Sequence, residues 1–135
     1  VQLKKLPTFI NNRRNNAKLF NLLFKDEPNI IIQKETEESS WFGFSIILTN
    51  KLSGYRDDLV NILSENSIEC RPIVAGNFTK NSVIKYLDYD IIGELKVSDE
   101  IDYNGFFVGN DFRDLTGEIN YLHKTIKSFE KEIFN

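Results

Sequence analysis

The residue types best suited to chemistry gather in one segment, from Arg71 to Lys80. An arginine opens the segment, and an amide, an aromatic ring, a hydroxyl and an ammonium follow at Asn77, Phe78, Thr79 and Lys80. A guanidinium fork and an ammonium bind phosphate oxygens, and an amide and a hydroxyl can hydrogen-bond sugar hydroxyls. From residue types alone, an ordinary strand-to-loop corner with a solvated arginine is the simpler interpretation.

Two adjoining elements must position these groups. Alternating residues over 68–73 predict a strand that carries Arg71. The sequence Ala75-Gly76-Asn77 then predicts a sharp turn, because glycine adopts positive φ without cost and asparagine tolerates it better than most residues. The arginine is therefore expected at a strand edge, beside the loop that carries the other four groups.

Periodicity predicts the helices. Apolar residues spaced by three and four positions predict helices at about 6–25 and 116–134. Arg13 lies on the apolar stripe of the first helix, and we interpret it as a snorkelling side chain with its stem on the core. A third helix is expected to open at Ser53 or Gly54 and to close at Asn66, a residue that suits a left-handed closing position.

The remaining segments predict strands and turns. Strands are predicted at 29–33, 41–50 and 105–110, and short helical turns at 81–87 and 98–103. The strand at 41–50 is nearly all apolar, so we expect it to be central and covered on both faces. Ser98 is expected to cap the second turn. Runs of strands with helices between them favour an α+β layer with a mainly antiparallel sheet and helices on one face.

Composition excludes several classes of function. The 135 residues suit one folded domain, and a net charge of -3 argues against a non-specific nucleic-acid binder. No apolar run approaches the ~20 residues that a membrane-spanning helix needs. One histidine and one cysteine exclude a structural zinc site, and Cys70 alone cannot form an internal disulfide. Because the sequence contains no methionine, we interpret it as a piece of a longer protein.

Four segments carry a resemblance to a known family. They are Ser40-Trp-Phe-Gly-Phe-Ser-Ile46, Arg71-Pro-Ile-Val-Ala-Gly-Asn-Phe-Thr-Lys80, Gly93-Glu-Leu-Lys-Val-Ser-Asp-Glu-Ile101 and Gly105-Phe-Phe-Val-Gly-Asn110. In the same order, they resemble motifs in the C-terminal part of the DegT/DnrJ/StrS sugar aminotransferases. The likeness spans the whole chain and is greatest for the branch that includes the nucleotide-sugar 3-dehydratases.

The resemblance implies a fold and a division of labour. The fold would be the small C-terminal domain of a fold-type-I pyridoxal-phosphate-dependent transferase, with residues 1–25 as a connecting helix and 26–135 as the small domain. A large domain upstream would hold pyridoxal phosphate and the Schiff-base lysine, or the histidine that replaces this lysine in the dehydratases. No catalytic residue and no metal site is then expected in this chain, which alone would be inactive.

The resemblance also implies site residues. Arg71, Gly76, Asn77 and Phe78 would form one wall of a nucleotide-sugar site. In that wall Arg71 would steer an anionic group, Asn77 would hydrogen-bond the sugar or cofactor side, and Gly76 would allow close approach of the backbone.

The function implied first is a cytoplasmic, homodimeric aminotransferase. It would pass an amine from an amino acid to a nucleotide-linked keto-sugar, in lipopolysaccharide, surface-polysaccharide or deoxysugar biosynthesis. One alternative is a pyridoxamine-phosphate-dependent nucleotide-4-keto-6-deoxysugar 3-dehydratase, and another is a non-enzymatic binding module. Two departures loosen the assignment to a branch: Ser82 replaces the usual proline, and Asp111 stands where aminotransferase relatives often carry histidine.

Overall fold

The computed structural model describes residues 2–134, so the predicted segments 1–25 and 26–135 each have one terminal residue outside the described range. The helices are α1 (Leu6–Phe24), α2 (Arg56–Glu65), α3 (Lys96–Asn104) and α4 (Thr116–Phe134). The strands are β1 (Ile30–Ile32), β2 (Gly43–Leu48), β3 (Cys70–Arg71) and β4 (Gly105–Gly109). Short 3-10 helices cover Gln2–Lys5, Asn50–Leu52, Phe78–Lys80 and Ser82–Tyr86.

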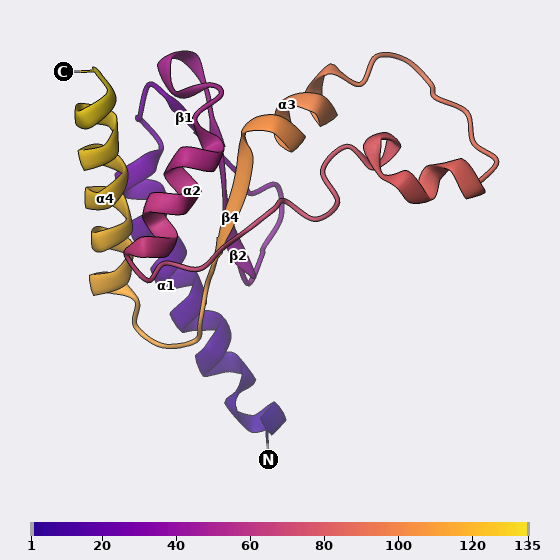
Figure 1. Cartoon of the computed structure of the whole chain (residues 1–135). Helices are drawn as coiled ribbons and strands as arrows, with labels where there is room; N and C mark the ends of the chain where they lie inside the picture. The colour runs from indigo at the N-terminus through magenta and orange to yellow at the C-terminus, as the bar shows by residue number, and fades with distance from the viewer. Residues whose placement is uncertain (1, 135) are drawn as a thin grey trace.

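The four strands form one antiparallel sheet in the order β1-β2-β4-β3. Helices α1, α2 and α4 lie together on one side of it, as Figure 1 shows. The register places Phe44 opposite Val108 and Ile46 opposite Phe106, and all four side chains are buried against these helices. The predicted α+β architecture, with helices on one face of an antiparallel sheet, is confirmed.

The two long helices form because their apolar stripes are buried. In α1, Ala17, Phe20 and Phe24 recur every three or four residues, and the Phe20 ring stacks on Phe44 of β2 at 4.3 Å between centroids. Burying each such aromatic side chain contributes roughly 1.5–3 kcal/mol. Both helices have bounds close to those predicted from periodicity.

The central strand corrects one prediction. Strand β2 begins at Gly43 rather than at 41, because Trp41 adopts φ 52°, outside the extended region. On the face turned away from the helices, Ser45 and Ile47 are only half-buried. The expectation that this strand is covered on both faces is therefore wrong within residues 2–134.

After β3 the chain makes a long excursion away from the core before it returns through α3 (Figure 1). The strand predicted over 68–73 shortens to Cys70–Arg71, since Pro72 has no N–H to donate to a sheet. Helix α3 begins at Lys96, before the predicted turn, so Ser98 lies in its first turn and does not cap it. The left-handed residue after α2 is Ser67, at φ 61°, and not Asn66.

No helix in the described part of the chain is long and apolar enough to cross a membrane.

Candidate functional site

The segment Arg71–Lys80 leaves the sheet edge and forms a loop that rests on α3. Gly76 adopts φ 59°, as the predicted turn requires. A Cβ added at Gly76 would collide with the Asp102 carboxylate of α3, so glycine is the residue that fits this contact. The turn is therefore held against α3 through the bare backbone of Gly76.

Asn77 is turned into the chain. It is 5% exposed, and its Nδ2 donates to Asp99 Oδ1 of α3 at 2.8 Å. Its Oδ1 accepts from the backbone N–H of Thr79 at 3.1 Å and from Thr79 Oγ1 at 2.7 Å, which starts the Phe78–Lys80 turn. Three hydrogen bonds to neighbouring residues of the same chain thus engage the Asn77 amide.

Lys80 joins the same carboxylate. Its Nζ lies 2.7 Å from Asp99 Oδ1 and 3.5 Å from Asp102 Oδ2. The hydrogen bond from Lys80 lowers the pKa of Asp99, and the bond from Asn77 adds to this effect. The same bond to Asp99 raises the pKa of Lys80, so both groups stay charged across the neutral range.

Arg71 and Phe78 face outward. Arg71 pairs with Phe107 across β3 and β4, and its Nε and Nη2 donate to Glu69 Oε1 at 3.0 and 2.8 Å. The arginine side chain is 67% exposed, so this ion pair is weak and easily exchanged for another anion. Phe78 is 44% exposed. These two side chains are the predicted site residues that remain accessible to a ligand.

A groove of about 870 Å³ lies beside Arg71. Its walls include Phe42, which directly precedes β2, Phe107 from β4, Tyr121 from α4 and Arg13 from α1. The Nε of Arg13 is buried and has no hydrogen-bond partner within residues 2–134. Arg13, interpreted from the sequence as a snorkelling side chain, thus lies at the groove wall between α1 and the sheet.

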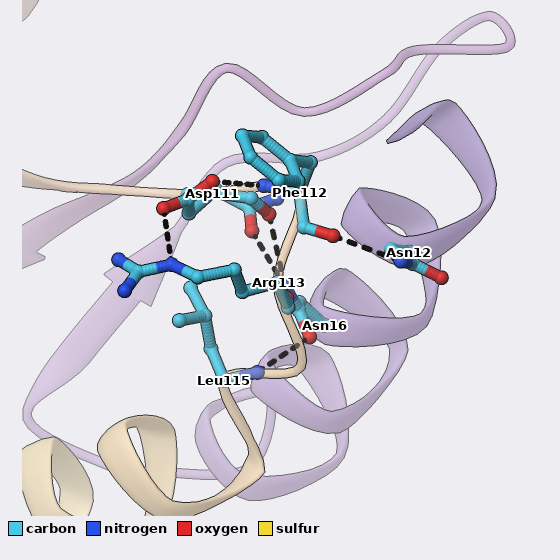
Figure 2. A network of polar contacts seen from close by, with 7 residues as sticks. Asn12, Asn16, Asp111, Phe112, Arg113 and Leu115 are labelled. Atoms are coloured by element: carbon cyan, nitrogen blue, oxygen red, sulfur yellow. Dashed lines mark hydrogen bonds and ion pairs between the residues drawn. The ribbon is translucent and has the colours of Figure 1, made fainter. Parts of the chain in front are cut away.

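The loop that forms another wall of this groove is tied to α1 by a polar network (Figure 2). Asn16 of α1 donates to the carbonyl oxygens of Asp111 and Arg113, at 3.2 and 2.8 Å, and accepts from Leu115 N–H at 3.1 Å. Asn12 donates to Phe112 O at 2.8 Å. The network holds residues 111–115 in one position relative to α1.

Asp111, which the sequence left without a role, shapes this loop. Its carboxylate accepts from Phe112 N–H at 2.5 Å and from Arg113 Nε at 2.6 Å. Partial burial opposes ionisation of Asp111, but these bonds together lower its pKa. Sequence reasoning missed Asn16, although its position four residues before Phe20 places a polar side chain on the apolar stripe of α1.

No group of three or more metal-ligating side chains occurs in the part of the chain that the structure describes.

The chain is similar to several curated proteins, two of which are named GDP-4-keto-6-deoxy-D-mannose 3-dehydratase. It is 52% identical over 127 residues to GDP-4-keto-6-deoxy-D-mannose 3-dehydratase of Yersinia pseudotuberculosis. The aligned region covers 93% of this chain and 32% of that protein. The chain therefore spans about a third of the length of the curated relatives that it matches.

Solved structures agree in fold. The GDP-4-keto-6-deoxy-D-mannose-3-dehydratase of E. coli with bound hydrated PLP superposes with a TM-score of 0.87 at 50% identity, over 92% of this chain and 32% of that one. A mutant of GDP-4-keto-6-deoxymannose-3-dehydratase with bound GDP-perosamine gives the same TM-score and identity, 0.87 and 50%, over 92% of this chain and 32% of that one.

The sequence also matches the model of a known protein family. The model of the DegT/DnrJ/EryC1/StrS aminotransferase family matches residues 1–109. This range includes three of the four motifs in full and β4, the strand of the fourth. The resemblance read from the sequence is confirmed: the chain belongs to the DegT/DnrJ/EryC1/StrS aminotransferase family.

Proposed function

We propose that this chain is the substrate-side domain of an enzyme that removes the 3-hydroxyl of a nucleotide-linked 4-keto-6-deoxysugar. The substrate would be GDP-4-keto-6-deoxymannose. The observation that carries this proposal is the 52% identity to a 3-dehydratase of that sugar, spread over 93% of the chain. The E. coli structure, similar over almost the same stretch at 50% identity, also supports it.

The aminotransferase that the sequence first implied is the second candidate. The description of the family favours it. The relatives that share half or more of their aligned residues with this chain are both named 3-dehydratases, however. Sequence identity at that level favours the dehydratase. A non-enzymatic binding module has no support from these relatives.

The cofactor proposed for the full-length enzyme is pyridoxal phosphate or its amine form, which supplies an electron sink for the chemistry at the sugar. Residues 2–134 do not fit a complete site for it. Lys80, the lysine of the candidate loop, is engaged by Asp99 and Asp102. Asn77 is likewise engaged internally. We therefore derive no chemical step within this chain and propose that the cofactor lies in an upstream domain.

The proposed contribution of this chain is one wall of the sugar site. Arg71 would exchange Glu69 for an anionic group of the nucleotide, since its ion pair is exposed. Phe78 would offer a ring face to the sugar or the base. Gly76 would let the loop backbone approach the ligand closely. Asn77 would not contact the ligand directly. It would hold the loop in the conformation that presents Gly76 and Phe78.

The arrangement proposed for the whole protein follows the same reasoning. Residues 1–25 would lead from the cofactor-bearing domain and 26–135 would form the small domain opposite it. The protein would act as a homodimer in the cytoplasm, in the biosynthesis of lipopolysaccharide or other deoxysugar-containing polysaccharides. In the aminotransferase alternative, an amino acid would be the amine donor.

The proposal is tested by the product of the full-length protein. GDP-4-keto-6-deoxymannose would be incubated with the protein, pyridoxal phosphate and glutamate, and the products would be analysed by mass spectrometry. The expected product has lost the oxygen at carbon 3 and keeps its carbonyl group. A product in which an amine replaces the carbonyl oxygen would support the aminotransferase instead. The 135-residue chain alone is expected to convert nothing.

A further inference from the structure

Two of the family motifs meet in space through one carboxylate oxygen. Asn77, in the loop motif, and Asp99, in the motif that begins at Gly93, are 22 positions apart. Asp99 Oδ1 accepts from Asn77 Nδ2 at 2.8 Å and from Lys80 Nζ at 2.7 Å. A single oxygen of α3 therefore contacts both ends of the loop turn that starts at Asn77.

Helix α3 is fixed to the core at its other end. Asn104, the last residue of α3, is fully buried. Its Oδ1 accepts from Gly54 N–H at 2.8 Å, and its Nδ2 donates to Ser53 Oγ at 3.1 Å. These bonds tie α3 to the segment before α2, so Asp99 stands on a rigid support.

The bond to Asp99 also fixes which way the Asn77 amide points. With Nδ2 directed at Asp99, the amide oxygen is directed at Thr79, where it accepts from both the backbone N–H and Oγ1. The bond from the Thr79 backbone N–H caps the 3-10 turn Phe78–Lys80 at its first end. The orientation of the exposed Phe78 ring therefore depends on Asp99, although Asp99 lies outside the loop.

We propose that Asp99 is the positioning residue of this loop: it sets the conformation of residues 76–80 that receives the nucleotide-sugar, and does not contact the sugar itself. The functional part of this inference rests on the proposed function. The side chains of Lys80 and Asp99 are 54% and 48% exposed, and an exposed pair contributes little to global stability. Loss of Asp99 is therefore expected to disturb the loop and not the fold.

The test uses the full-length enzyme with Asp99→Ala and Asp99→Asn. Asp90→Ala is the matched control, because Asp90 is an exposed carboxylate on the same excursion and has no ion pair within residues 2–134. Amide hydrogen exchange is measured for peptides covering 75–81 and for β2 and β4. The KM for GDP-4-keto-6-deoxymannose and kcat are measured in parallel.

For Asp99→Ala, we expect faster exchange in 75–81 and unchanged exchange in β2 and β4. We also expect a KM about tenfold higher, with kcat within about threefold of wild type, since uniform binding is what is lost. Asp99→Asn keeps an oxygen that can accept from Asn77 and should recover part of the KM. Adding Lys80→Ala to Asp99→Ala should change little further, because both partners act through one carboxylate.

The outcomes separate the two proposals. Unchanged exchange in 75–81 for Asp99→Ala would overturn the positioning role of Asp99. Faster exchange with an unchanged KM would confirm that Asp99 orders the loop. It would overturn the proposal that this loop receives the sugar. A loss confined to kcat would also overturn the positioning role, because a loop that only binds should not act on the chemical step.

Discussion

Asn16 of α1 and Asn110, at the end of β4, share a buried hydrogen bond of 3.0 Å from Asn16 Nδ2 to Asn110 Oδ1. The Nδ2 of Asn110 continues the network to the carbonyl oxygens of Trp41, at 2.9 Å, and Arg13, at 3.1 Å. The pair therefore links α1, the start of β2 and the end of β4. It fixes the groove wall at 110–115 to α1.

Replacing Asn110 by alanine tests that link. The change removes three side-chain hydrogen bonds: the carbonyl oxygens of Arg13 and Trp41 each lose a donor, and Asn16 Nδ2 loses its buried acceptor on Asn110. An unsatisfied buried polar group costs roughly 1–3 kcal/mol, so the free energy of unfolding should fall by about 2–4 kcal/mol in urea titrations. Asn12→Ala, which removes one exposed bond to Phe112 O, should cost less than about 1 kcal/mol. Equal losses in the two variants would contradict the account.

Gly76→Ala tests the contact between the loop and α3. Gly76 and Gly93 both have positive φ, 59° and 76°, but only Gly76 faces a side chain, that of Asp102. Both alanine variants pay roughly 1–2 kcal/mol for the left-handed backbone, and Gly76→Ala must also displace Asp102. In the full-length enzyme we expect KM to rise about tenfold for Gly76→Ala and less than about twofold for Gly93→Ala. A similar KM for both would show that the contact with Asp102 does not matter.

Glu27 makes stability depend on pH. Its carboxylate meets His123 Nε2 at 2.8 Å and Lys127 Nζ at 2.9 Å, and so joins the end of α1 to α4. Burial opposes its ionisation, but the bonds and charges of Lys127 and His123 together lower its pKa below the ordinary 4.5. The folded state therefore binds this proton less readily than the unfolded chain. The stabilisation is present above pH 4.5 and is lost as the pH falls through the folded pKa.

The measurement for Glu27 is urea unfolding of wild type and Glu27→Gln across this range. The variant should be less stable by roughly 1–2 kcal/mol at neutral pH, and the difference should shrink as the carboxylate of the wild type becomes protonated. Asp26→Asn is the control, since Asp26 is 87% exposed in its 3.8 Å pair with Lys25. A difference between wild type and Glu27→Gln that stays constant with pH would refute this role.

The thiol of Cys70 is expected to react slowly. Burial, with a smaller effect of the Glu69 charge, raises its pKa from 9.0 to about 11. Only the thiolate reacts. A pKa that is higher by about two units therefore lowers the thiolate fraction near neutral pH by about 100-fold. Alkylation by iodoacetamide should be slower by about that factor in the native protein than in urea, and Glu69→Gln should speed the native reaction. Equal rates for native and unfolded protein would contradict the shift.

The long helices and the face that they bury could be predicted because local periodicity determines both. The stripe of Phe20 and Phe24 in α1 and that of Ile119, Leu122 and Ile126 in α4 are buried as their spacing indicates. The segment of the candidate site and its turn at Gly76 were also readable, because a glycine before an asparagine marks positive φ.

No feature of the sequence near Asn77 indicated that its side chain would point inward. Its partner Asp99 lies 22 residues away in α3, an element that the sequence predicted only as a short turn. The length of β3 was also overestimated. The alternation of residues continues past Pro72, but Pro72 has no N–H to donate, so the strand ends at Arg71. Roles that depend on distant partners required the three-dimensional structure.

The most direct test of the central claim is a hydrogen-exchange footprint of the full-length protein with and without GDP-perosamine, the ligand in the structure of a similar dehydratase. The account predicts slower exchange at residues 71–80 on binding, with α4 unchanged, because the loop and Arg71 would form one wall of the site. Binding of the ligand without any protection at 71–80 would contradict it.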